Sequence, residues 1–253
     1  MAAFKPAQAD LVSMGLFAAE AGLAEWVTAP LLRSIGVNPW SDFQKVSRLI
    51  FLHIAKCAGT SLLRQLPSGI VGAHNNHFAA IQYWAHDAKA FRDSFKFAIV
   101  RCPVERFVSA WKYALFSGRC GPLGNRVPSS VNQTARLLAQ PLGRRYLWSA
   151  PHFRPQLSFL LAPVFNSSSE EKNQPWNQLG ISVDFVARLD KFAEALEILS
   201  NHLNMRLSPD LVVNSTGSFR YRPNCLFDSN LSDESRELIL RFYQADYEFF
   251  QSL

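Results

Sequence analysis

Two short stretches of the sequence carry residue types suited to binding an anion. The first, "AKCAGTS", spans Ala55 to Ser61 and places a lysine, a glycine and two hydroxyl residues directly after an apolar run. Such a turn offers backbone amides at the start of a helix, close backbone approach at the glycine and a point charge, which together suit a phosphate. The P-loop pattern GxxxxGK[ST] is not met, because Lys56 precedes Gly59. An ordinary strand-to-helix turn with a surface lysine is the alternative.

The second stretch, "RCPVERFVS", also follows an apolar run. Arg101 opens it and Ser109 lies eight residues later, about two helical turns along. The planar guanidinium group matches phosphate oxygens, and the serine hydroxyl can add a neutral hydrogen bond. Arg101 could equally pair with Glu105, one turn further on, as an ion pair at the start of a helix. Both interpretations stay open at the level of sequence.

Two histidines, His74 and His77, precede a helix-like pattern in "HNNHFAAIQYW". A neutral imidazole near pH 7 suits the removal of a proton from a hydroxyl group. Both residues could instead be polar loop histidines. We predict no metal site here, because no Cys, Asp or Glu stands at ligand spacing beside them.

The apolar pattern around these stretches predicts strands that alternate with helices. "RLIFLHIA", from Arg48, and "FKFAIV", Phe95 to Val100, have the length and composition of buried strands, and each is followed by helix formers. Pro103 stands where a helix tolerates proline best, at its first position. "SVDFVARLDKFAEALEILSNHLN" predicts a strand, a turn and a helix, and "SDESRELILRFYQADYEFFQ" predicts a helix with Ser232 as N-cap.

This alternation predicts the α/β class, with a P-loop-like parallel sheet flanked by helices in three layers. Because parallel strands end at one edge of such a sheet, both anion-binding turns should open onto that edge. We expect residues 1–46 to form a short N-terminal helical extension and residues 47–253 to form the catalytic domain. Two Gly-, Pro- or Ser-rich stretches, Ser117–Ser130 and Asn166–Leu179, are expected to be loops that shape a substrate cleft.

The composition narrows the class of protein. The 253 residues are 48% hydrophobic and 18% charged, which is typical of a globular domain. The net charge of +6 is scattered along the chain, so we expect anionic small ligands and no nucleic-acid partner. Four cysteines lie far apart without a CxxC pair, which argues against a zinc ribbon or a disulfide framework. The N-terminus matches neither a membrane span nor a signal peptide, so we expect a cytoplasmic protein without stable membrane insertion. The sequence does not indicate an oligomeric state.

Taken together and in this order, the two turns resemble a known family. "HIAKCAGTSL" is similar to the HxPKTAGTSL 5′-phosphosulfate loop, and "FAIVRCPVERFVSAW" is similar to the VRDPxERxxSxY 3′-phosphate motif. These motifs belong to sulfotransferases that use 3′-phosphoadenosine-5′-phosphosulfate (PAPS), of the carbohydrate type related to the heparan 2-O and chondroitin 4-O enzymes (sulfotransferase family 2). The resemblance continues in "HFRPQLSFL", "DFVARLDKFAEAL" and "LILRFYQADYEFF", over roughly residues 49–250.

The resemblance implies an enzyme that transfers a sulfuryl group from PAPS to a hydroxyl of a saccharide without a metal. It implies that seven consecutive residues cradle the 5′-phosphosulfate: Ala55, Lys56, Cys57, Ala58, Gly59, Thr60 and Ser61. Lys56 would contact the bridging and sulfuryl oxygens and take part in catalysis, while Arg101 and Ser109 would hold the 3′-phosphate.

The resemblance also implies residues on the acceptor side. His77 stands where relatives carry a catalytic histidine, and His74 is its rival for that role. The segment "PHFRPQ" matches a family segment near the acceptor, which implies substrate-binding roles for His152, Arg154 and Gln156.

Three departures from the family pattern occur in the two turns. Ala55 stands in place of proline, Cys57 in place of threonine and Cys102 in place of aspartate or asparagine. The first change loosens the turn and the second removes a hydroxyl. Lys56, Gly59, Thr60, Arg101 and Ser109 are all kept, so we expect an active enzyme. The alternatives are a P-loop-like kinase of a small alcohol, which the position of Lys56 disfavours, and a nucleotide-binding module without catalysis.

Overall fold

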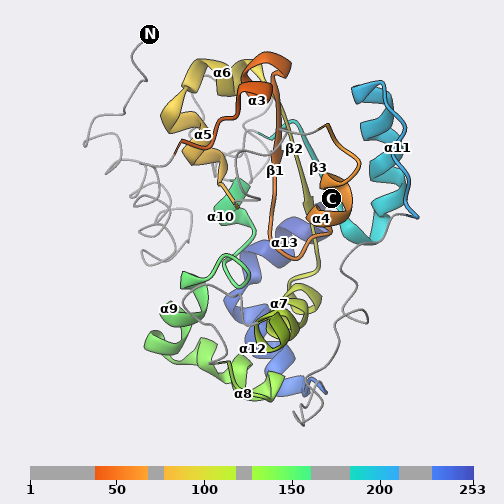
Figure 1. Ribbon diagram of the computed structural model, residues 1–253. Coiled ribbons are helices and arrows are strands. Elements are labelled where there is room, and N and C mark those ends of the chain that lie inside the picture. Colours follow the sequence, from red (N-terminus) through yellow and green to blue (C-terminus); the bar gives the residue numbers. More distant parts are fainter. Residues whose placement is uncertain (1–37, 68–76, 118–126, 161–182, 211–229) are drawn as a thin grey trace. The chain divides into compact units, whose positions relative to one another are not determined.

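The computed structural model describes residues 38–67, 77–117, 127–160, 183–210 and 230–253 (Figure 1). The chain forms two compact units. Unit 1 comprises Met1–His53, Leu66–Ala98 and Gln156–Val186, and unit 2 comprises Ile54–Gln65, Ile99–Pro155 and Ala187–Leu253. No helix in the described residues has the length and apolar character needed to span a membrane.

A three-stranded sheet begins in unit 1. Strand β1 (Leu49–Leu52) pairs in parallel with β2 (Phe95–Val100), with Leu49 opposite Phe95 and Leu52 opposite Ala98. Strand β3 (Phe185–Arg188) completes the sheet, whose order β1-β2-β3 makes β2 the central strand. All four residues of β1 are apolar and buried, as expected of a strand covered on both faces. The predicted α/β class, with a parallel sheet flanked by helices, is confirmed.

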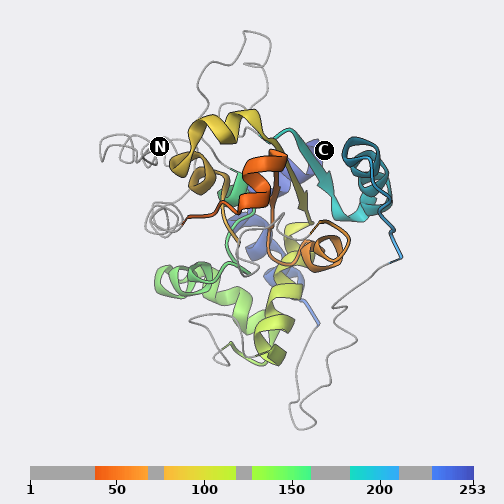
Figure 2. The same ribbon diagram turned by 45° about the horizontal axis from the view of Figure 1, so that its top comes forward.

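Four helices of unit 1 are described: α3 (Asp42–Ser47), α5 (Ala80–His86), α6 (Ala88–Asp93) and α10 (Leu157–Leu160). Helix α3 lies beside β1, and α5 lies beside α6 (Figure 2). The apolar spacing of "HFAAIQYWAHDAKAFRDSF" predicts one continuous helix where α5 and α6 stand. The helix breaks at Asp87, whose side chain accepts a hydrogen bond of 2.9 Å from the amide of Ala90 and caps α6.

The segment before β1 is tied to α5 within unit 1. A capping box between Ser41 and Gln44 opens α3. The side-chain amide of buried Gln44 donates to the Tyr83 hydroxyl at 3.2 Å, and the Trp40 indole donates to the Tyr83 carbonyl at 3.1 Å. Residues 38–46 of the predicted extension therefore pack against α5, whereas residues 1–37 lie outside the described residues. The boundary at residue 46 stays a prediction.

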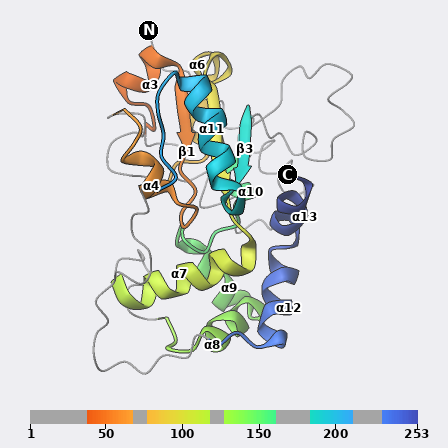
Figure 3. The same ribbon diagram turned by 90° about the vertical axis from the view of Figure 1, so that its right-hand side faces the viewer.

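Unit 2 is largely helical in its described part. Its α-helices are α4 (Gly59–Leu63), α7 (Pro103–Ser117), α8 (Val131–Arg136), α9 (Pro141–Ser149), α11 (Phe192–Leu203), α12 (Asp233–Phe242) and α13 (Gln244–Ser252). Two short 3-10 turns, η3 (Leu137–Ala139) and η6 (Leu189–Lys191), precede α9 and α11. Helices α7, α8 and α12 pack against one another (Figure 3). The predicted start of α7 at Pro103 and the predicted Ser232 N-cap of α12 are confirmed.

Tyr243 lies at the centre of the unit 2 core, at the junction of α12 and α13. Its hydroxyl accepts a hydrogen bond of 2.9 Å from the Trp148 indole and donates one of 2.5 Å to the carbonyl of Phe153. Burial raises the pKa of this phenol, so it stays protonated. The predicted single C-terminal helix is broken at Tyr243, which ends α12 with φ −116° and ψ 29°. Its buried hydroxyl joins distant segments of unit 2.

Candidate functional site

The turn after β1 exposes some side chains and buries others. Ala55 and Cys57 are each only 1% exposed, while Lys56 and Thr60 are half-buried. Lys56 and Ala58 adopt positive φ angles of 70° and 57°, a region that L-residues other than glycine rarely occupy. A non-glycine residue in this region costs on the order of 1–2 kcal/mol. The surrounding structure must therefore hold this turn in a shape that its own residues disfavour.

One buried arginine of α7 supplies that support. Arg106 is 2% exposed and its guanidinium donates to three backbone carbonyls of unit 2. Its Nε donates to Ala55 at 2.9 Å, its Nη1 to Arg154 at 2.8 Å and its Nη2 to Pro151 at 3.3 Å. Arg106 thus fixes both the turn after β1 and the segment 151–154 to the same helix. The sequence alone gives no sign of this role of Arg106.

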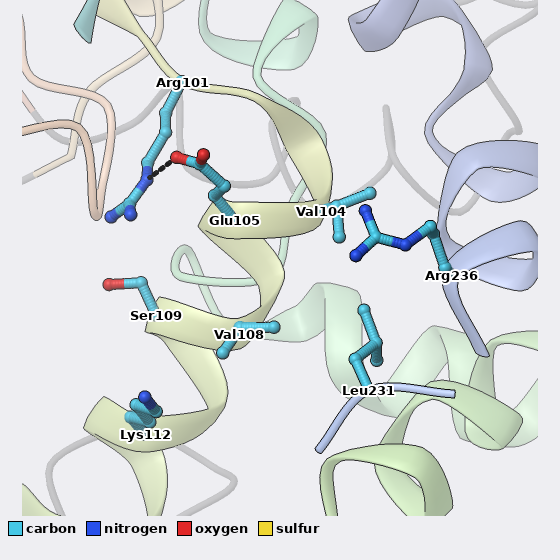
Figure 4. Close-up of a pocket in the computed structure, with 8 residues that line it drawn as sticks. All are labelled: Arg101, Val104, Glu105, Val108, Ser109, Lys112, Leu231 and Arg236. Atoms are coloured by element: carbon cyan, nitrogen blue, oxygen red, sulfur yellow. Dashed lines mark hydrogen bonds and ion pairs between the residues drawn. The ribbon is translucent and has the colours of Figure 1, made fainter. Parts of the chain in front are cut away.

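A cavity of about 350 Å³ lies along α7 (Figure 4). Its lining combines polar and apolar side chains: Arg101, Val104, Glu105, Val108, Ser109, Lys112, Leu231 and Arg236. In Figure 4, Arg101 and Ser109 project on the same side of α7, and Arg236 reaches toward the cavity from α12. The structure therefore brings Arg101 and Ser109 to one cavity. The ion pair with Glu105 also forms, with 3.1 Å between Arg101 Nε and Glu105 Oε2.

The charges of this cavity favour an anion. Three cations and one carboxylate line it, which leaves a net charge of two positive. This charge matches a phosphate monoester dianion, and the hydroxyl of Ser109 offers a further hydrogen bond. Lys112 and Arg236 were missed at the level of sequence. Lys112 follows Ser109 by three residues and its helical spacing could have revealed it, whereas Arg236 comes from a distant helix with no such signal.

Lys56 lies on an aromatic ring supplied by α7. Its Nζ is 4.4 Å from the centroid of the Tyr113 ring, and that ring stacks on His152 with 4.6 Å between centroids and 21° between planes. Tyr113 was also missed, because the sequence does not show which residue of α7 faces the turn.

The predicted acceptor residues fall in both units. His152 and Arg154 belong to unit 2, and Gln156 belongs to unit 1. Arg154 is 8% exposed and Gln156 is 1% exposed, while His152 is half-buried. Burial and the nearby charge of Arg106 lower the pKa of Arg154 to about 10, which leaves it charged at neutral pH.

The two predicted hydroxyls and the thiol of the turn differ in their surroundings. Ser61 is 4% exposed, so Thr60 has the more accessible hydroxyl. Burial raises the pKa of the Cys57 thiol to about 11, more than the neighbouring arginine charges lower it. Cys57 is therefore an uncharged packing residue at neutral pH, and oxidation at this position is disfavoured.

His77 is held by a hydrogen bond in unit 1. Its Nδ1 lies 2.8 Å from the carbonyl oxygen of His53, and the two imidazole rings lie 4.4 Å apart. Because a carbonyl oxygen can only accept, Nδ1 carries the proton and Nε2 keeps its lone pair in the neutral ring. This tautomer suits a general base. The rival His74 lies outside the described residues.

Comparison with known proteins gives one family. Residues 41–127 match the model of the Sulfotransferase family. The matched segment is less than half of the chain and contains the turn at Lys56, His77, Arg101 and Ser109. No curated protein and no solved structure matches the chain significantly.

The match shows that this segment is similar to the sulfotransferase family, whose name denotes transfer of a sulfur-containing group. The sulfotransferase-like segment ends before the 151–154 segment and before α12, so the predicted continuation of the resemblance to residue 250 stays a prediction. In the part of the chain that the structure describes, no group of three or more His, Cys, Asp or Glu residues could hold a metal ion.

Proposed function

We propose that this protein transfers a sulfuryl group from PAPS to a hydroxyl of a carbohydrate acceptor. The observation that carries the proposal is that the sulfotransferase-like segment contains, in order, the strained turn with Lys56, the oriented His77, and the Arg101 and Ser109 pair in a cationic cavity. Bound PAPS would supply the sulfuryl group and leave as 3′-phosphoadenosine-5′-phosphate (PAP).

The cavity along α7 fits the 3′-phosphate of this donor. Its net charge of two positive matches the phosphate dianion, and the planar guanidinium group of Arg101 suits the geometry of phosphate oxygens. Ser109 would donate its hydroxyl. We add Lys112 and Arg236 to this site, because both line the same cavity and increase its positive charge.

The turn after β1 fits the 5′-phosphosulfate. Lys56 would stabilise the negative charge that grows on the bridging oxygen as the sulfuryl group leaves, and backbone amides from Ala55 to Ser61 would share that charge. The missing proline is offset by the hydrogen bond from Arg106 to the Ala55 carbonyl. The missing threonine hydroxyl fits a position that is fully buried, since Cys57 is 1% exposed.

His77 would act as the general base. Its Nε2 lone pair would accept the proton of the acceptor hydroxyl, while the hydrogen bond from Nδ1 to His53 keeps the ring oriented. We keep His152, Arg154 and Gln156 as proposed acceptor-side residues. Among these three, His152 has the most accessible side chain and is the strongest candidate for direct contact.

Titration calorimetry with PAP and with magnesium ATP tests the donor. We expect PAP to bind without a metal and ATP to bind at least tenfold more weakly. Tight, magnesium-dependent ATP binding without PAP binding would indicate a kinase and overturn the proposal.

Transfer of labelled sulfate to a panel of glycans then separates an enzyme from a binding module. His77→Asn is the sharpest variant, because its side-chain amide can still donate to the His53 carbonyl but has no basic nitrogen. We expect it to lower kcat about 10²- to 10⁴-fold while PAP affinity is kept. A wild-type protein that binds PAP but transfers sulfate to no acceptor would instead favour the module.

A further inference from the structure

Three side chains of unit 2 form a stack beside the strained turn. Lys56 lies on one face of the Tyr113 ring, with Nζ 4.4 Å from the centroid, and His152 stacks against that ring at 4.6 Å. The three residues come from three separate segments: the turn after β1, helix α7 and the segment after α9. The Tyr113 ring therefore connects three segments that are distant in sequence.

The backbone on both sides of this stack is held from the same helix. Arg106 and Tyr113 are seven residues apart on α7, about two turns, so both lie on one helix face. Arg106 binds the carbonyl of Ala55, next to Lys56, and the carbonyl of Pro151, next to His152. The rings and the backbone are therefore fixed together, and Tyr113 has a defined position relative to the turn.

An aromatic ring holds a lysine without cancelling its charge. The ring face attracts the ammonium through its quadrupole and has no net charge of its own. A carboxylate at the same place would neutralise Lys56, as Glu105 partly does for Arg101. The lysine side chain is long and flexible. Contact with an uncharged aromatic ring can therefore fix the position of its ammonium group without neutralising the charge.

We propose that Tyr113 is a positioning residue that holds the Lys56 ammonium at the turn, with His152 supporting the ring by stacking against it. The catalytic consequence rests on the proposed function, in which Lys56 stabilises the leaving oxygen. The positioning itself is independent of that function. It assigns His152 a part in the site that does not require contact with an acceptor.

The direct test compares Tyr113→Leu with Tyr113→Phe and reads the reactivity of the Lys56 amine. An amine-acylating reagent is applied to the folded protein, and peptide mass spectrometry gives the labelling rate of Lys56 relative to exposed Lys89. We expect Tyr113→Leu to raise this ratio about three- to thirty-fold, because the ring contact is lost. Tyr113→Phe retains the ring and should rescue the wild-type ratio. An equal ratio in all three proteins would overturn the proposal.

A second measurement uses sulfuryl transfer. Tyr113→Leu should lower kcat about three- to thirty-fold, Tyr113→Phe should restore it, and Tyr113→Leu should have no further effect when Lys56 is already methionine. An equal loss in the Lys56→Met background would show that Tyr113 acts on the fold alone. If the wild type neither binds PAP nor transfers sulfate, the proposed function fails. The labelling ratio still decides whether Tyr113 holds the Lys56 ammonium in position.

Discussion

The turns after β1 and after β2 each carry a cation, Lys56 and Arg101, but the two turns are stabilised differently. The turn after β1 puts Lys56 and Ala58 at positive φ, starts a helix of only five residues, and has no side-chain hydrogen bond at its N-cap. The turn after β2 places Pro103 at the first position of a helix of 15 residues and pairs Arg101 with Glu105. The first turn is held by other segments, whereas the second has a local helix start and a local ion pair.

The two turns also differ in whether the charge of their cation is shared with a carboxylate. The turn after β1 depends on Arg106 for its backbone and on the Tyr113 ring for its lysine, and that ring leaves the charge of Lys56 in place. The turn after β2 shares its charge with a carboxylate and adds cations along a regular helix. The first arrangement suits a point where charge changes during a reaction, and the second suits steady binding of an anion.

The largest expected effect comes from removing the anchor of the first turn. Arg106→Ala leaves three buried carbonyls without their donor, so we expect it to lower the free energy of unfolding by about 3–5 kcal/mol. Urea denaturation measures this change. Arg136→Ala is the matched control, because its ion pair with Glu234 is exposed and should cost less than about 1 kcal/mol. Similar losses for the two variants would mean that the turn does not depend on Arg106.

The next contrast is kinetic. Lys56→Met should lower kcat about 10²- to 10³-fold, because the lysine is proposed to act on charge that grows in the transition state. Arg101→Ala should raise the donor KM and the Kd of PAP about tenfold to a hundredfold, with a smaller change in kcat, because it is proposed to bind a constant charge. Steady-state kinetics and calorimetry measure both. The same pattern of losses in the two variants would erase the distinction between the turns.

A pH dependence distinguishes the buried thiol of the first turn. The unfolded Cys57 thiol loses its proton near pH 8.5, whereas burial raises the pKa of the folded thiol to about 11. The folded state therefore binds more protons between these values, and the stability contributed by Cys57 falls as pH rises through this window.

Between pH 9 and 10, we expect the titration of Cys57 to lower the free energy of unfolding of the wild type by about 1 kcal/mol per pH unit. Cys57→Ala should remove this decrease, which urea unfolding midpoints measure. Cys102→Ala, at the half-buried thiol of the second turn, should keep the decrease because Cys57 is still present. A wild-type pH profile unchanged by Cys57→Ala would show that the thiol titrates alike in both states.

The smallest expected effect is that of an alanine-to-glycine change, which should alter the free energy of unfolding with opposite signs in the first turn and inside α7. Ala58→Gly relieves the positive φ of 57° and should raise the free energy of unfolding by about 0.5–1 kcal/mol, after the entropy of glycine in the unfolded chain is counted. Ala114→Gly, inside α7, should lower it by about 1 kcal/mol. Thermal and urea unfolding measure both changes. A destabilising Ala58→Gly would argue that the strain at this position is not real.

Local patterns explain how much of the fold could be predicted. Strand β2 and the start of α7 were predicted residue for residue, because an apolar run and a proline at the first helical position are local signals. The breaks at Asp87 and Tyr243 were missed. Apolar spacing continues through both positions, and only a cap in one case and a buried hydroxyl in the other interrupt the helix.

The site was likewise predictable only where its residues lie close together in sequence. The family resemblance implied that Arg101 and Ser109 act together, and both residues line one cavity. The roles of Arg106 and Tyr113 depend on partners far away in sequence: the Ala55 carbonyl is 51 residues from Arg106. Arg236 joins the cavity from α12 in the same way. A single sequence carries the residue types but not these pairings, which folding alone creates.

The hydroxyl of Tyr243 also sets an order of events during synthesis. Its partner Trp148 is made 95 residues earlier, and at about 5–20 residues per second the ribosome takes roughly 5 to 20 s to deliver Tyr243. During that interval the indole of Trp148 and the carbonyl of Phe153 lack the group that joins them in the finished core. Unit 2 can therefore complete its core only after translation has passed residue 243.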